Sequence, residues 1–505
     1  MVDPVFHIRS IVDVRIYLCL LLLPILVLSA EAQSPVAQPG RPLSLEDALA
    51  LAEKTSEQMT IARAGIERAG GDQIRARSER YPQLSATASY DRALASEFSG
   101  LFTESGTGTP CAPFVPNPAA GVDERLAELE RAVDCGATGL PADDGLGNLE
   151  ELPFGRKNTY RLNFAFSQLL YSAGRLDALD ARAGAARENA EITLTSTRAQ
   201  VMLDVVQAYY DAALSQRLLE IAEATFAQAD AAYAQTRLGF EAGSQPEFEV
   251  LRAQVARDTQ RQTVIRRRSE RDIALLRLRQ MLELPAGEPL SLTTRLEGDT
   301  LPPPAPFAAG VMTATANAAA DVARATVRQA ETALRISEAS VDVARSLRKP
   351  NASLTSSYGE VGYPSGALPG FGDFRRNWTI GANVQMSIFD GGRLRADELI
   401  ARADVQEARA RLLQTRELAL VDNQTAFEEL TAFQAAWEAS AGTIQQAQRA
   451  YEISELRYRE GVSTQLELSD ARLLLEQAQA NRAQAARDLQ VARARVALLP
   501  DLPVR

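Results

Sequence analysis

Few residues of this chain have the types and spacing that catalysis requires. The single histidine, His7, lies in an expected export leader, so the mature chain lacks the commonest general base and metal ligand. The adjacent carboxylates Asp143 and Asp144 lie in a polar loop that offers them no evident nucleophile or base as a partner. We therefore predict no catalytic residue, no metal site and no bound cofactor, and an exported enzyme is a poor hypothesis.

One acidic pair has a spacing with a physical consequence. Glu467 and Asp470 are three residues apart, which places both carboxylates on one face of a helix that begins just after Gly461. The positive end of the helix dipole favours acidic side chains in this position. Taken alone, the pair is therefore explained as a solvated acidic pair near a helix N-terminus.

The N-terminus has the features of an export leader over residues 1–32. Arg9 and Arg15 precede an apolar run, and an Ala-Glu-Ala cleavage pattern follows it. We expect the mature chain to begin near Gln33, and no later stretch approaches the ~20 apolar residues that a membrane helix needs.

Two cysteines remain in the mature chain, Cys111 and Cys135, and both lie in one polar loop. Because export leads to an oxidising compartment, a disulfide between them is the natural interpretation, with two free thiols as the alternative. Such a bond would staple the loop and would do no chemistry.

The charge balance argues against a nucleic-acid partner. The chain has 54 Lys and Arg against 65 Asp and Glu, a formal net charge of −11. Phosphate binding needs a basic surface, and here the arginines are spread along helix faces beside acidic residues.

The order of expected elements occurs twice, over residues 33–300 and again over 301–505. Each copy contains a helix, a pair of strands, a long helix, a tip and a shorter return helix. In the first copy the strands are joined by a loop over 97–156, which holds both cysteines. We predict two structural repeats of one unit.

A fixed spacing supports this duplication. The glycines expected to end the two long helices, Gly243 and Gly461, are 218 positions apart, as are Gly174 and Gly392 at the expected helix starts. At ~1.5 Å per residue, each long helix is on the order of 100 Å in length.

Alternation of apolar and polar residues predicts the strands. In the clearest case the apolar positions are Trp378, Ile380, Ala382, Val384, Met386 and Ile388. A sheet with such a face cannot stay exposed to water. Four strands are too few to close a barrel of useful width, so several copies of the chain are expected to contribute strands around a wet lumen, with the apolar face toward lipid. The alternative is a small soluble sheet packed on its own helices.

These features together resemble the TolC-like outer-membrane efflux protein family, also called outer membrane factors. The resemblance covers the whole mature chain and rests on the duplicated halves, the strand-to-helix Gly-Arg step and the tip segment Tyr458-Arg-Glu-Gly461. It implies a mostly α-helical fold with a transmembrane β-barrel. Four strands from each subunit of a homotrimer would close a 12-stranded barrel, and the long-helix hairpins would build an α-helical periplasmic tunnel.

The resemblance also implies roles for residues at the tips. Glu467 and Asp470 match the acidic residues that line the pore constriction in this family. Tyr458 and Glu249 match the residues that hold the tip closed, whereas Ser463 replaces an arginine of the prototype, which predicts a tip that opens more easily.

The implied function is a passive duct of a tripartite efflux or type I secretion system. It would lie in the outer membrane of a Gram-negative bacterium and extend into the periplasm. Its partners would be a periplasmic adaptor (membrane fusion) protein, an inner-membrane pump and outer-membrane lipid, with Gly243 and Gly461 at the adaptor contact. The alternative from another class is a periplasmic coiled-coil adaptor or scaffold.

Overall fold

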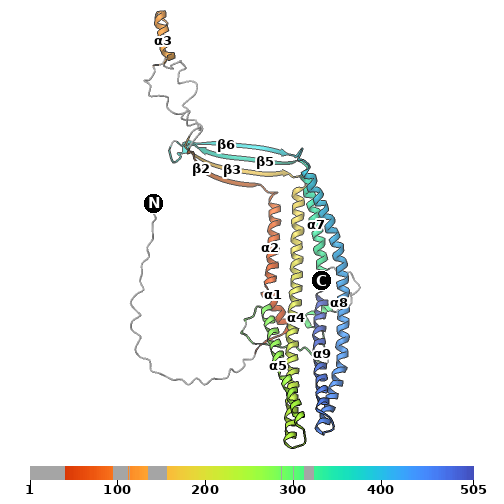
Figure 1. The fold of residues 1–505 in the computed structure, drawn as a ribbon. Helices are drawn as coiled ribbons and strands as arrows, with labels where there is room; N and C mark the ends of the chain where they lie inside the picture. Colours follow the sequence, from red (N-terminus) through yellow and green to blue (C-terminus); the bar gives the residue numbers. More distant parts are fainter. Residues whose placement is uncertain are drawn as a thin grey trace, which may run out of the picture.

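The computed structural model describes residues 40–94, 112, 114–115, 117–134, 156–285, 287–298, 301–311, 324–364 and 366–504. It shows a bundle of long helices with a four-stranded sheet at one end and two hairpin tips at the other (Figure 1). The expected leader over 1–32, the cysteines Cys111 and Cys135, and the pair Asp143 and Asp144 lie outside the described residues.

The two halves repeat one order of elements. The first half contains α1 (Leu45–Thr55), α2 (Glu57–Ser78), β2 (Gln83–Arg92), α3 (Val122–Asp134), β3 (Asn158–Tyr171), α4 (Arg175–Glu241) and α5 (Glu247–Met281). The second half contains α7 (Ala325–Ser346), β5 (Asn351–Gly362), β6 (Phe374–Gln385), α8 (Arg393–Arg459) and α9 (Gln465–Leu498). The shorter elements are β1 (Arg41–Leu43), β4 (Leu290–Leu292), η2 (Ala305–Phe307) and η3 (Phe371–Asp373). Both α4 and α8 have 67 residues, as the repeat predicts.

Two helical details differ from the expectation. The single helix expected from Ser44 is divided into α1 and α2, because Ser56 has non-helical backbone angles (φ −53°, ψ 122°). The segment 97–156, expected to be a loop, contains α3 in its described part. The apolar periodicity of α3 extends over only 13 residues, and the Gly- and Pro-rich sequence around the helix makes that pattern hard to recognise.

The last strand is also shorter than its apolar alternation suggests, because β6 ends at Gln385 and not at Ile388. Gln385 pairs with Asn351, the first residue of β5, and the residue before it is Pro350. Proline has no N–H to donate to a sheet ladder, so the pairing stops there.

The sheet has the strand order β2-β3-β5-β6 and is antiparallel throughout. The register places the apolar residues of all four strands on the same face, because Phe164 pairs with Ala86 and Tyr358, and Tyr358 pairs with Trp378. Leu84, Trp378 and Ile380 on this face are all more than 70% exposed. Within the described chain, β2 and β6 each have one unpaired edge.

The main hydrophobic core lies halfway along the helices, where α4 and α9 pack with α1 and the short elements. The buried Tyr209 on α4 donates a hydrogen bond to the carbonyl oxygen of Leu43 at 2.9 Å and accepts one from the N–H of Thr294 at 3.1 Å. This side chain therefore fastens the β1–β4 sheet to the long helix.

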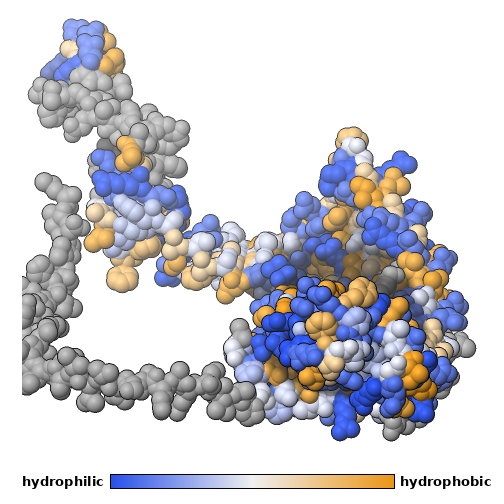
Figure 2. All heavy atoms as spheres, turned by 60° about the horizontal axis from the view of Figure 1, so that its bottom comes forward, coloured by the Kyte–Doolittle hydropathy of each residue, from blue (hydrophilic) through white to orange (hydrophobic). Residues whose placement is uncertain are grey.

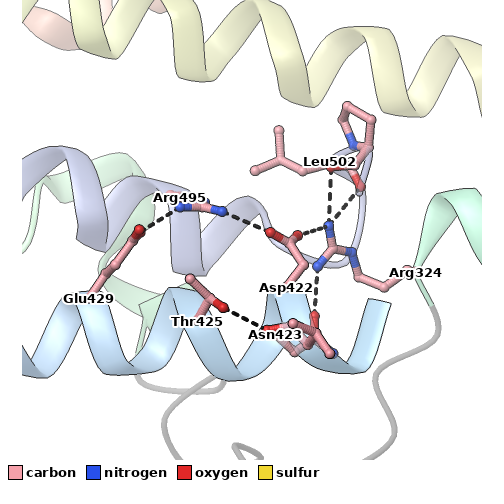
Figure 3. Close-up of polar contacts among 9 residues, drawn as sticks. Arg324, Asp422, Asn423, Thr425, Glu429, Arg495 and Leu502 are labelled. Carbon is pink, nitrogen blue, oxygen red and sulfur yellow. Dashed lines mark hydrogen bonds and ion pairs between the residues drawn. The ribbon is translucent and has the colours of Figure 1, made fainter. Parts of the chain in front are cut away.

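A buried ion-pair network joins the C-terminal segment to α8 (Figure 3). The fully buried Arg324 donates to Asp422 Oδ2 at 2.8 Å and to Asn423 Oδ1 at 2.6 Å. Arg495 on α9 reaches the other oxygen of Asp422 at 2.8 Å and Glu429 at 2.5 Å. Burial lowers the pKa of Arg324, and the hydrogen bond to Asp422 opposes that effect. Because each charge has a partner, the network fastens the start of α7, α8, α9 and the C-terminal segment of the second half together at modest net cost.

A second arginine cluster stiffens the region just below the sheet. Glu398 on α8 accepts hydrogen bonds from Arg348 at 3.0 Å, Arg345 at 3.3 Å and Arg402 at 2.6 Å. The hydrogen bond from Arg348 is the main cause of a lowered pKa for the Glu398 carboxyl group. The cluster fixes the end of α7 against the start of α8, where both helices meet the strands.

Candidate functional site: the hairpin tips

The first tip is a helix C-cap built around Gly243. The N–H of Ser244 donates to the carbonyl oxygen of Gly239 at 2.8 Å, and the N–H of Gly243 donates to that of Phe240 at 2.9 Å. This is the Schellman pattern, and it requires the left-handed backbone that Gly243 has, with φ of 76°. After this reversal, Pro246 leads into α5.

The second tip repeats the first. The N–H of Val462 donates to the carbonyl oxygen of Arg457 at 2.9 Å, and Gly461 has φ of 73°. Gly243 and Gly461 are both exposed, and an added Cβ at either position meets no atom within 4 Å. Since space is open at both, only backbone conformation demands glycine there.

The acidic pair follows directly after the second tip. Thr464 is the N-cap of α9, and its hydroxyl accepts a hydrogen bond from the N–H of Glu467 at 3.4 Å. Glu467 and Asp470 are both exposed, and a side-chain oxygen of Glu467 lies 3.9 Å from Arg457. The structure thus keeps both carboxylates accessible to solvent near the end of the hairpin.

Tyr458 joins the two hairpins of the chain. Its hydroxyl lies 2.8 Å from the hydroxyl of Thr236 on α4. Because Thr236 already donates its own hydrogen to the carbonyl oxygen of Ala232 at 2.8 Å, Tyr458 is the donor. The ring packs on a small buried cluster that includes Tyr451 and Leu468.

The other two residues expected at the closing contacts lie apart from this bond. Glu249 is in the first turn of α5, 3.9 Å from Arg252, and its Oε2 is buried without a hydrogen-bond partner in the described chain. The hydroxyl of Ser463 is likewise buried and unpartnered there. The structure therefore brings Tyr458 to Thr236, and not to Glu249, within one subunit.

Sequence reasoning missed two residues at this end of the molecule. Thr236 is almost completely buried, and Arg472 on α9 is 4% exposed with its Nε and Nη2 atoms unpartnered among the described residues. Burial lowers the pKa of Arg472, whereas the nearby Tyr451 and Glu455 raise it. Both residues occupy core positions of otherwise apolar helix stripes, and a polar residue at such a position was the available signal.

The tips carry a mixed surface. Figure 2 brings this end forward and shows hydrophilic and hydrophobic residues interspersed over the hairpin ends. The described residues contain no group of three or more His, Cys, Asp or Glu side chains arranged to hold a metal ion. None of the helices that the structure describes is both long and apolar enough to span a membrane.

Comparison of the sequence with known families decides where the chain belongs. The profile described as "Outer membrane efflux protein" matches residues 149–283 and 317–499, which is more than half of the chain. This chain belongs to the outer membrane efflux protein family.

Individual relatives agree with this assignment. The efflux protein is 25% identical over 393 residues to "Nodulation protein T" of Rhizobium leguminosarum bv. viciae, covering 74% of this chain and 78% of the relative. It is also 25% identical over 308 residues to "Toluene efflux pump outer membrane protein TtgC" of Pseudomonas putida, covering 61% of each chain. The fold matches the CmeC outer membrane channel of Campylobacter jejuni with a TM-score of 0.67 at 16% identity, over 91% of this chain and 86% of that one.

The efflux protein is thus a channel subunit in the outer membrane of a Gram-negative bacterium. The channel extends from that membrane into the periplasm. The expected fold class is confirmed, with long-helix hairpins and four strands in each subunit. Because the family match is to a channel, the adaptor and scaffold hypothesis is set aside. The family and the fold are those of channel proteins and not of enzymes.

Proposed function

We propose that three copies of this efflux protein form a passive export duct that opens at its hairpin tips and converts nothing chemically. The observation that carries the proposal is the four-stranded sheet, which has one continuous apolar face and two unpaired edges in the described chain. Pairing β6 of one copy with β2 of the next satisfies both edges and closes a barrel of 12 strands. The apolar face then lies toward lipid and the polar face toward the lumen.

The constriction of the duct is proposed to lie at Glu467 and Asp470. Both carboxylates are exposed, and both follow the reversal at Gly461. Three copies would bring six carboxylates around one opening, which favours cations over anions. Arg457, 3.9 Å from Glu467, offsets part of this charge.

The closed state is proposed to depend on Tyr458, Glu249 and Ser463. Tyr458 already ties α8 to α4 inside one subunit through Thr236. The oxygens of Glu249 and Ser463 are buried without partners in the described chain, so a rearrangement of the tip that gives them hydrogen-bond donors would be favourable. Since Ser463 lacks the charge of an arginine, the resting tip opens more easily than in a relative with arginine there.

The partners are proposed from the shape of the tips. The exposed glycines Gly243 and Gly461 present bare backbone at the periplasmic end, where a periplasmic adaptor protein can approach closely. An inner-membrane pump would complete the assembly and choose the substrate. One relative is named as a toluene efflux protein and another as a nodulation protein, so the duct itself is proposed to accept cargo of several kinds.

Conductance in a planar bilayer tests the proposal. The mature protein, purified in detergent, is compared with Glu467→Ala/Asp470→Ala and with a control, Glu46→Ala/Glu57→Ala, which removes the same charge from α1 and α2. We expect discrete cation-selective steps that become larger or less selective in the tip variant alone.

Two other outcomes are informative. Steps that are the same in all three proteins would keep the duct and discard the acidic constriction. Folded protein that forms no trimer and inserts into no bilayer would overturn the duct itself.

A further inference from the structure

The helix α3, in the connection between β2 and β3, has an apolar side that the described residues leave exposed. Val122, Leu126, Leu129 and Val133 are between 46% and 79% exposed. Figure 2 shows hydrophobic residues on one side of this helix and hydrophilic residues on the other. A helix with such a face gains stability only when something packs against it.

Another side of α3 is already occupied by its own chain. Arg131 donates hydrogen bonds to Glu128 on the same helix and to the carbonyl oxygen of Ala112 at 3.1 Å. Ala132 is buried at 2% exposure. The segment before the helix therefore contacts α3 through Ala112, and its residues Phe114 and Val115 line one hollow with Val122, Leu126 and Leu129. That contact leaves the four apolar residues 46–79% exposed.

The apolar positions follow the spacing of a coiled-coil seam. Steps of four, three and four residues separate Val122, Leu126, Leu129 and Val133, which are consecutive d, a, d and a positions of a heptad. We call these four residues the α3 seam. A seam of this kind packs against a second helix of the same kind by knobs-into-holes contacts.

The charges beside the seam select the partner. Arg125 occupies a g position and Glu130 the following e position, so in a parallel pair of identical helices Arg125 of one copy faces Glu130 of the next. The helix carries five acidic residues and two arginines, which gives it a net negative charge. An anionic lipid surface would repel such a helix.

The topology supplies the parallel arrangement. β2 begins next to α2, so its last residue, Arg92, and the first residue of β3, Asn158, lie at the end of the sheet away from the helices (Figure 1). The connection that contains α3 starts and ends there. Copies related by a rotation axis along the duct present their α3 helices at the same end and in the same direction. Tethering also raises their effective concentration.

We propose that the three α3 helices of one assembly pack through the α3 seam into a parallel three-helix bundle at the outer mouth of the duct. This inference rests on the proposed trimer. The bundle places a helical cap over the end of the barrel opposite the tips, so the duct has a second structured element at its outer end.

Site-directed disulfide formation tests the bundle. Leu126→Cys puts a thiol in the seam, and Ala127→Cys puts one at the neighbouring outward b position as the matched control. Assembled protein in detergent is treated with copper–phenanthroline, blocked with a maleimide and run on a non-reducing gel beside the wild type, which reports the background from Cys111 and Cys135. We expect covalent dimers from Leu126→Cys at several times the yield from Ala127→Cys, because facing a positions lie within disulfide range.

A charge exchange tests the direction of the helices. Arg125→Glu in the Leu126→Cys background should lower the dimer yield, and adding Glu130→Arg should restore it. Restoration is specific to a parallel pair, since only there do these two positions face each other.

The oligomeric state, measured by light scattering on the same samples, distinguishes a failure of the α3 bundle from a failure of the trimer. Trimers in which Leu126→Cys and Ala127→Cys give equal yields of covalent dimer would overturn the bundle and leave the duct. An absence of trimers would overturn both. Protection of the seam thiol from maleimide only in vesicles that contain lipopolysaccharide would assign the seam to lipid and overturn the bundle.

Discussion

At the residue scale, the hydroxyl of Tyr458 links the two hairpins near the tip by its hydrogen bond to Thr236, and farther from the tip Gln260 on α5 donates to Glu476 on α9 at 3.3 Å. Tyr458→Phe keeps the ring in its cluster and removes the hydrogen bond to Thr236, at an expected cost of about 1 kcal/mol. Because the bond joins α8 to α4 only while the hairpins are together, its loss favours the open tip. We expect more frequent or larger conductance steps.

Thr236→Val provides the matched test of this link. It should reproduce the effect of Tyr458→Phe, and the double variant should add little, since both changes delete the same bond. Additive effects would show that the two hydroxyls act separately.

Residues at the tips differ in how far the sequence predicts them. Glu467 and Asp470 are exposed as expected, because their placement depends only on the helix period and on a nearby start of α9. The partner of Tyr458 was not predicted, because Thr236 lies 222 positions away and meets it only through hairpin packing. Their roles in gating remain proposals.

At the element scale, two glycines of α8 and its tip should respond in opposite ways to alanine. Gly461 has φ of 73°, so Gly461→Ala forces a left-handed alanine at a cost of roughly 1–2 kcal/mol. Gly442 lies inside α8 with no atom within 4 Å of an added Cβ, so Gly442→Ala should stabilise the helix by roughly 0.5–1 kcal/mol. Thermal unfolding followed by circular dichroism at one heating rate checks both signs.

The contrast is informative because the substitution is the same in both variants. A fall in the unfolding temperature for Gly442→Ala as well would mean that a neighbouring subunit occupies that surface. An unchanged unfolding temperature for Gly461→Ala would mean that the tip contributes nothing to the measured transition.

The long helices were predictable from the sequence, and the short helix α3 and the break between α1 and α2 were not. The pattern over the two long helices extends across many turns, so it predicts α4 and α8 to within a few residues. The break at Ser56 depends on the backbone of one residue between two apolar stripes. α3 spans only 13 residues, too few for its period to stand out among glycines and prolines.

At the scale of the whole molecule, the sheet is the reason for proposing that several chains make up the functional unit. The strand pattern predicts which face is apolar, and the register confirms it, since paired residues such as Tyr358 and Trp378 share that face. What the pattern of one chain does not contain is the neighbour that pairs with β2 and β6. We propose that neighbour, a second copy of the chain, from the two strand edges that are unpaired in the described residues.

Adjacent residues of β6 allow a direct test of the two faces. Ile380 pairs with Ser356 on the apolar face, and Thr379 pairs with Ser357 on the polar face. A lysine that faces lipid near the bilayer midplane costs ~2–4 kcal/mol, whereas a lumen-facing lysine stays in water. Ile380→Lys should therefore reduce insertion into lipid vesicles strongly, and Thr379→Lys should insert as the wild type does and lower the cation selectivity. Equal insertion of both variants would mean that the apolar face packs against protein, and the sheet would then not be the wall of a membrane duct.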